Sequence, residues 1–191
     1  EASMNEVLAA GIILLTGWDK QSDFVDPMCG SGTLAIEAAL MACNIPAGRN
    51  RNMGFETWKD FDKALWEQIK AEANAKIKSA DCSIYAHDID EKALKVATTN
   101  ASRAGVKATV VINPPYGERI EVFDISEFYK DMGTRLKHFY PGCEAWVISS
   151  NIEAIKHFGL RPTRRIKLFN GPLECRLHKY VLYKGSKRDM Y

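Results

Sequence analysis

The sequence predicts an α/β fold: a doubly wound parallel sheet that finishes with an antiparallel pair of strands. Short apolar runs alternate with helical patterns over most of the 191 residues, which is typical of parallel sheets covered by helices on both faces. Near the end, Asn170-Gly171 separates two strand-like runs, and Asn-Gly is a strong signal for a two-residue hairpin turn. A glycine-rich turn at 30–33 precedes a helical pattern and favours a small-molecule site.

Hydrophobic periodicity predicts the individual elements. Apolar residues at helical spacing predict helices over 5–15, 33–43, 59–77, 91–104 and 126–139, and a short helix that ends near 159. Short apolar runs predict strands at 24–25 leading into Asp26-Pro27, and at 83–86, 109–112 and 145–149. One domain over 1–191 is expected, because a chain of this length with 46% hydrophobic residues can bury one sizeable core.

Composition excludes several classes of protein. Lys and Arg total 26 against 24 Asp and Glu, so the net charge of +2 is too even to indicate nucleic-acid binding, and any basic surface must be local. Five cysteines without metal-ligand spacing argue against a zinc site or a disulfide framework and favour the cytoplasm. No apolar run approaches the roughly 20 residues that cross a membrane. Because the chain starts at Glu1 within a helical pattern, we expect it to be part of a longer protein.

The stretch Asp26-Pro27-Met28-Cys29-Gly30-Ser31-Gly32-Thr33 is the first candidate site. Its spacing alone also fits a nicotinamide or flavin dinucleotide, but the acid expected about 20 residues later is absent. A carboxylate ahead of the glycines repels a pyrophosphate and suits a cation, while a helix start can hold a carboxylate. S-adenosylmethionine fits both conditions, because its sulfonium and ammonium are cationic and it also carries a carboxylate. The alternative is a tight turn without a ligand.

A second acidic stretch, Asp88-Ile89-Asp90, follows the predicted strand at 83–86. Asp88 is placed to accept hydrogen bonds from ribose hydroxyls, and Ile89 is placed to cover an adenine face. Asp90 is either a further cofactor contact or the N-cap of the next helix.

The stretch Asn113-Pro114-Pro115-Tyr116-Gly117 is the more specific motif. Consecutive prolines after a strand keep the backbone extended and leave a carbonyl free as an acceptor. The Asn113 side chain and the Pro114 carbonyl can together accept both hydrogens of an exocyclic amine, and Tyr116 can stack on the base. The alternative is a proline-terminated strand with a core tyrosine.

These three motifs, with Glu118-Arg119 after the last, resemble those of the THUMP-associated RNA methylases. The sequence is similar to bacterial proteins labelled N6-adenine-specific DNA methylase and to the 23S rRNA guanine-N2 methyltransferase. The resemblance covers nearly the whole chain and implies the class I methyltransferase (Rossmann-like) fold with a reversed final strand, and S-adenosylmethionine as cofactor. It also implies an RNA-binding THUMP domain ahead of the catalytic one, which this chain does not show.

One departure from the family lies between 105 and 109, where the family has a further strand and helix. Four residues span at most ~14 Å, too little for both elements. We expect a segment near 106–109 to be missing from the numbered sequence, which predicts consecutive residues there much farther apart than the ~3.8 Å of a trans peptide.

The motifs and the resemblance together predict an enzyme that transfers a methyl group to an exocyclic nitrogen of an RNA base. The resemblance implies guanine N2 of 23S rRNA as the favoured acceptor, since the motifs themselves do not identify the base. It predicts no metal and no membrane partner, and Cys29 is not expected to act as a nucleophile. Adenine-N6 methylation of DNA and a non-catalytic subunit that binds S-adenosylmethionine and RNA are the alternatives. Two basic groups are interpreted as phosphate contacts: Arg49, Arg51 and Arg119, and, less favoured, Arg161, Arg164, Arg165 and Lys167.

Overall fold

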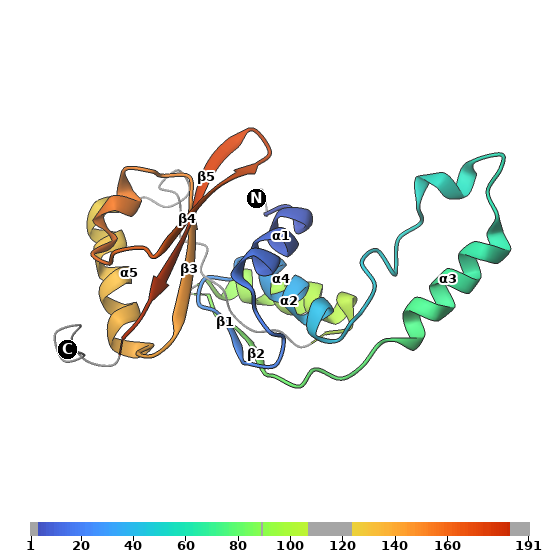
Figure 1. Cartoon of the computed structure of the whole chain (residues 1–191), viewed down its shortest axis with the longest axis horizontal. Helices are drawn as coiled ribbons and strands as arrows, with labels where there is room; N and C mark the ends of the chain where they lie inside the picture. Colours follow the sequence, from blue (N-terminus) through green and yellow to red (C-terminus); the bar gives the residue numbers. More distant parts are fainter. Residues whose placement is uncertain (1–3, 89, 107–123, 184–191) are drawn as a thin grey trace.

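The computed structural model describes residues 4–88, 90–106 and 124–183 (Figure 1). The elements are α1 (Glu6–Thr16), β1 (Phe24–Asp26), α2 (Thr33–Ala42), η1 (Gly54–Thr57), α3 (Lys63–Ala75), β2 (Ile84–Ala86), α4 (Glu91–Ala104), α5 (Ile125–Phe139), β3 (Glu144–Ser149), η2 (Ala154–Phe158), β4 (Arg164–Asn170) and β5 (Leu173–Val181). The alternation of helices and strands is confirmed. The strand predicted at 109–112 and the break predicted between 106 and 109 lie outside the described residues.

Two sheets are described where one continuous sheet was expected. β1 and β2 pair in parallel, with Asp26 opposite Ala86. The second sheet is antiparallel in the order β3-β5-β4, with Ser149 of β3 opposite Arg176 of β5. The hairpin predicted at Asn170-Gly171 is therefore confirmed as β4 and β5. The strand predicted at 109–112 falls outside the described residues, and within the described part of the chain the two sheets share no strand pairing.

Helices cover both faces of the antiparallel sheet, as a doubly wound architecture requires. On one face, α1, β1 and α2 pack against β3 and β5 through a cluster that includes Ile12, Leu34, Trp146 and Leu177. On the other face, α5 and η2 pack through Tyr129, Phe158, Val147 and Tyr180, among others. β3 is buried from its second residue to its last, so it carries core residues on both faces.

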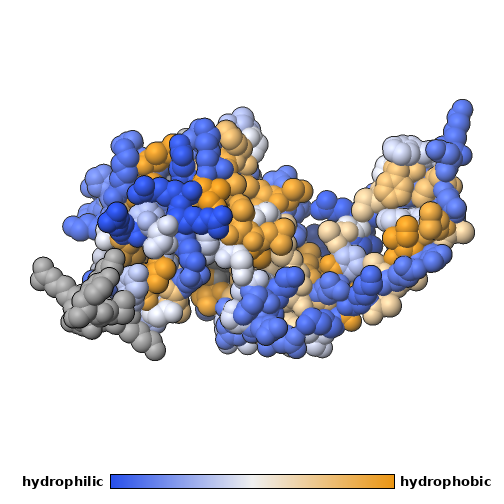
Figure 2. Space-filling view, viewed as in Figure 1, coloured by the Kyte–Doolittle hydropathy of each residue, from blue (hydrophilic) through white to orange (hydrophobic). Residues whose placement is uncertain are grey.

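Residues 45–80 form an arm that projects from the body (Figures 1 and 2). Its aromatic side chains gather around Phe55, whose ring centroid lies 5.0 Å from that of Trp66 and 6.4 Å from that of Trp58. Helix α3 has no buried residue, and Trp58 is 67% exposed. The predicted helix over 59–77 is shorter in the structure because Asp62 caps it, accepting a hydrogen bond from Leu65 N at 2.9 Å.

Gly133 lets η2 approach α5 closely. A Cβ atom at Gly133 would lie well inside contact distance of the Phe158 carbonyl oxygen. We expect Gly133→Ala to destabilise the protein by about 1–3 kcal/mol, because the backbone of η2 must move to make room. Urea unfolding measures this change.

Gly11→Ala in α1 is the matched control, because a Cβ there meets nothing within 4 Å. It should leave stability unchanged or raise it by up to about 1 kcal/mol through helix propensity. Equal effects of the two substitutions would contradict the close packing of η2 on α5.

Candidate active site

The glycine-rich turn joins the end of β1 to the start of α2. Asp26, at the end of β1, is only 1% exposed, and its Oδ1 accepts a hydrogen bond from Met28 N at 3.4 Å. Gly30 and Gly32 have φ values of 52° and 83°, in the left-handed region that favours glycine. A Cβ at Gly30 would meet nothing within 4 Å, whereas at Gly32 it would lie 3.1 Å from Ala97 Cβ. Gly30 thus faces open space, and Gly32 allows α4 to pack closely.

The Asp88 carboxylate connects this turn to the end of β2. Gly30 N donates to Asp88 Oδ2 at 2.8 Å, and Asp90 N donates to Asp88 Oδ1 at 2.9 Å. Each carboxylate oxygen can accept a further hydrogen bond, so Asp88 keeps capacity for two hydroxyl donors. The structure thus brings the two sequence-predicted motifs into direct contact.

Asp90 occupies the N-cap position of α4. Its side chain accepts a hydrogen bond from Lys92 N at 2.8 Å, which is the structural role considered from the sequence. Ile89, between the two acids, lies outside the described residues.

Helix α4 supports the turn through a contact that sequence reasoning missed. Asn100 Nδ2 donates to the Ser31 carbonyl oxygen at 3.0 Å, and Ser31 Oγ lies 3.1 Å from Thr33 Oγ1. Asn100 follows Ala97 by three residues, so both lie on the helix face that meets the turn. No local sequence pattern signals this contact, because it joins residues 69 positions apart.

Cys29 is buried beside the two carboxylates. Burial, followed by the negative charges of Asp26 and Asp88, raises the pKa of its thiol to about 12. The thiol therefore stays protonated near neutral pH and is a poor nucleophile.

The predicted RNA-contacting arginines are only partly described. Arg51 forms an ion pair with Glu6 of α1 at 3.0 Å, so its positive charge is partly neutralised within the protein. Arg49 is exposed and has no ion pair with a described residue. Arg119, and the motif Asn113, Pro114, Pro115 and Tyr116, lie outside the described residues.

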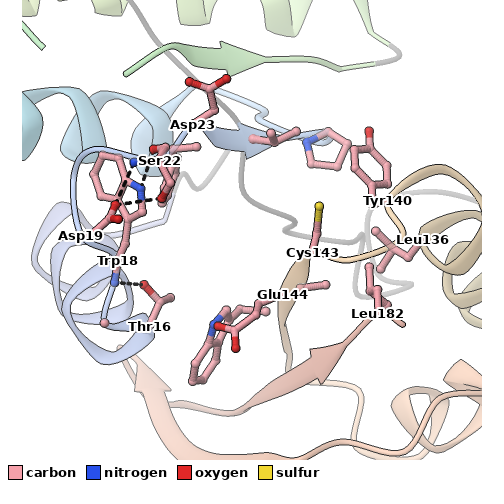
Figure 3. A pocket seen from close by; sticks show the side chains of 16 residues that line it. Thr16, Trp18, Asp19, Ser22, Asp23, Leu136, Tyr140, Cys143, Glu144 and Leu182 are labelled. Carbon is pink, nitrogen blue, oxygen red and sulfur yellow. Dashed lines mark hydrogen bonds between the residues drawn. The ribbon is translucent and has the colours of Figure 1, made fainter. Parts of the chain in front are cut away.

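A cavity of about 440 Å³ lies between β1 and β3 (Figure 3). Its walls include Trp18, Val25 and Pro27 on one side and Glu144 and Trp146 on the other. Within the described part of the chain, β1 pairs only with β2 and β3 only with β5, so the cavity separates two strand edges.

The described residues show neither a metal-binding cluster nor a membrane-crossing helix. Ranges 4–88, 90–106 and 124–183 contain no group of three or more side chains placed to hold a metal ion. No helix in that part of the chain has the length and apolar character needed to cross a membrane.

The turn, the carboxylate at the end of the second strand and the helix-covered sheets define the class of α/β proteins with a methyltransferase-type fold. The chain belongs to the UPF0020 family of RMKL-like methyltransferase domains, whose model matches residues 1–112 and 107–179.

Curated relatives carry the name ribosomal RNA large subunit methyltransferase K/L. The protein of Shewanella sp. (strain W3-18-1) is 36% identical over 214 residues, covering 98% of this chain and 30% of the relative. The protein of Vibrio campbellii is 37% identical over 216 residues, covering 99% and 31%. The chain thus spans about a third of the length of these relatives.

Solved structures confirm the fold. The crystal structure of SMU.472, a provisionally assigned methyltransferase complexed with SAH, superposes with a TM-score of 0.85 at 30% identity, covering 97% of this chain and 55% of that one. A provisionally assigned methylase of Clostridium difficile 630 has a TM-score of 0.84 at 33% identity, with the same coverage of both chains.

The raised pKa of Cys29 predicts slow alkylation. At about pH 8, iodoacetamide should modify Cys29 at least ~100-fold more slowly than Cys143, which is exposed, because Cys29 is buried and almost entirely protonated. Peptide mapping by mass spectrometry over time measures both rates. Equal rates would mean that Cys29 is an accessible thiolate and would reopen its role as a nucleophile.

Proposed function

We propose that this chain is the catalytic domain of an S-adenosylmethionine-dependent RNA methyltransferase. Its acceptor would be an exocyclic amino nitrogen of an RNA base, with guanine N2 of 23S rRNA favoured. The observation that carries the proposal is the contact between Gly30 and Asp88, which joins two sequence motifs beside open space.

The described residues fit the cofactor chemically. Asp88 retains acceptor capacity for the two ribose hydroxyls. The first turn of α2 starts at Thr33 and presents backbone N–H groups to a carboxylate. The negative charge of Asp26 suits the positive end of the ligand. Bound S-adenosylmethionine supplies an electrophilic methyl group, and a relative of this chain, SMU.472, was solved with SAH.

The acceptor side of the proposal depends on the motif 113–116. The Asn113 side chain and the Pro114 carbonyl would hold the amine with its lone pair toward the methyl group, Pro115 would keep the backbone extended, and Tyr116 would hold the base ring. Such positioning recovers much of the entropic cost of a two-substrate reaction. It requires the base to leave its stack, as other base-modifying enzymes do.

RNA is favoured over DNA by the curated relatives, which are named for ribosomal RNA. Adenine-N6 methylation of DNA is the second candidate, because a solved structure from Listeria monocytogenes, named a predicted N6-adenine-specific DNA methylase, is 32% identical, with a TM-score of 0.80. Transfer of labelled methyl from the cofactor to total RNA and to genomic DNA, with the modified nucleoside identified by mass spectrometry, decides between them. An RNA substrate of this kind also supports a cytoplasmic location.

The domain proposal includes a missing strand and helix after α4. Alignments with the relatives run over 214 or 216 residues, more than the 191 of this chain, so the relatives carry additional residues. The family model matches in two stretches, 1–112 and 107–179, which overlap at 107–112, next to the expected departure. Both findings support the proposal that an outer strand and helix are skipped there.

Asp88→Ala should weaken SAH binding by ~1.5–3 kcal/mol, because it removes the acceptor proposed for the ribose and releases Gly30 N. Isothermal titration calorimetry measures the dissociation constant. Asp131→Ala, at an exposed carboxylate of α5, is the matched control and should bind as the wild type does. Unchanged affinity in Asp88→Ala would remove Asp88 from the cofactor site.

Asn113→Ala should leave SAH affinity nearly unchanged and lower the rate of methyl transfer by at least ~100-fold, since its proposed contact is with the acceptor amine. Single-turnover transfer to RNA separates the chemical step from binding. Wild-type turnover by this variant would refute the positioning role.

A further inference from the structure

The β4–β5 hairpin overhangs the rest of its sheet. β3 ends at Ser149, opposite Arg176, but β4 and β5 remain paired beyond this point as far as Asn170 opposite Leu173. Figure 1 shows the tip of the hairpin standing clear of the body. No other described strand pairs with this overhanging part of the hairpin.

This overhang lies on the same side of the protein as the glycine-rich turn. Met28, within the turn, packs against the cluster that contains Ala154 and Ile155, which follow the end of β3. The cavity between β1 and β3 is lined by Phe24 and Val25 of β1 and by Glu144 and Ala145 of β3, the first residues of each strand, so both strands begin at the same edge. Their carboxyl ends therefore point the same way, and the hairpin extends beyond that edge. A substrate that reaches the proposed cofactor site must pass close to this edge.

One face of the hairpin is rich in positive charge. Arg165, Lys167 and Phe169 alternate along β4, which is the edge strand, and so share a face. Arg176 lies opposite Lys167, and Glu174 forms ion pairs with both. This face thus carries three cations and one carboxylate. Glu174 pairs with Lys167 and Arg176, whereas Arg165 has no ion pair with a described residue.

His178, opposite Arg165, reports this positive field. Burial, followed by the nearby positive charges of Arg165 and Arg176, lowers the pKa of His178 to about 4. The histidine is therefore neutral at physiological pH, and the charge of this face comes from the arginines and Lys167.

An aromatic side chain completes the face. Phe169 is 55% exposed next to the hairpin turn, and Lys167 Nζ lies 5.2 Å from its ring centroid. Cations on an edge strand also serve to block pairing with other strands. That role does not account for an exposed phenylalanine on the same face, because an apolar edge favours association. Cations beside an exposed ring are the pattern that binds single-stranded nucleic acid.

We propose that this face of the β4–β5 hairpin binds single-stranded RNA flanking the target base, with Arg165 and Lys167 contacting phosphates and Phe169 stacking on a base. The inference rests on the RNA substrate proposed above and adds a binding surface to it.

Fluorescence anisotropy with a labelled single-stranded RNA of roughly 12 nucleotides tests the surface on the full chain. Phe169→Ala should weaken binding about fivefold or more with an unchanged salt slope, because stacking carries no charge. Arg165→Ala and Lys167→Ala should each weaken binding and reduce the slope of log K against log salt by about 0.7, measured between about 50 and 200 mM salt.

Two residues of α5 serve as matched controls. Arg135→Ala removes an equivalent charge that is paired with Asp131, and Phe139→Ala removes an aromatic ring that is 72% exposed. Both should bind RNA within about twofold of the wild type, and thermal unfolding checks that every variant is folded.

Wild-type RNA affinity in Phe169→Ala and Arg165→Ala would overturn the inference, as would a wild-type chain that fails to bind RNA at about 50 mM salt. Competition by polyglutamate as strong as that by unlabelled RNA would indicate an acidic protein partner and would also overturn it. SAH titration of the same variants should match the wild type. If the wild type itself binds no SAH, the proposed function fails, while the anisotropy result still decides the role of the hairpin.

Discussion

The hydrogen bond from Gly30 N to the Asp88 carboxylate is the contact on which the candidate site depends. It joins the turns that follow two adjacent parallel strands, so the register between Asp26 and Ala86 fixes where the two motifs meet. Because Gly30 has positive φ and an open side, the backbone can donate to Asp88 while it remains accessible to a ligand. The Asp88 carboxylate can therefore hold the turn in place and still accept hydrogen bonds from ribose hydroxyls.

Helix α4 and the buried strand β3 hold this arrangement in place. The helix contacts the turn through Ala97 at Gly32 and through Asn100 at Ser31. β3 packs against α1 on one face and α5 on the other, so both helical layers share one strand as their core. The β4–β5 hairpin continues from that core. Its position relative to the glycine-rich turn is therefore fixed, although the two lie far apart in the sequence.

Local features were predictable from the sequence because they depend on nearby residues. The Asn170-Gly171 hairpin and the turn before α2 carry their own signals, and the N-cap role of Asp90 was one of two readings of its position. The extent of the arm helix was overestimated because Asp62 caps it from within an apparently helical pattern.

Contacts between distant segments were not predictable. The hydrogen bond between Asn100 and Ser31 joins residues that periodicity treats as independent. The ion pair of Arg51 with Glu6 likewise turns a predicted phosphate contact into a partly intramolecular one. The arm likewise depends on three-dimensional packing, since the aromatic residues that gather around Phe55 come from separate parts of the segment.

The most direct test of the central claim is an NMR titration of the ¹⁵N-labelled chain with SAH. The account predicts that the largest shift changes occur at the backbone amides of Gly30, Ser31 and Asp90. The indole N–H signals of Trp18, in the cavity between the sheets, and of Trp58, on the arm, should barely move. Saturation with no change at Gly30, or with changes centred on Trp18, would place the ligand elsewhere and contradict the account.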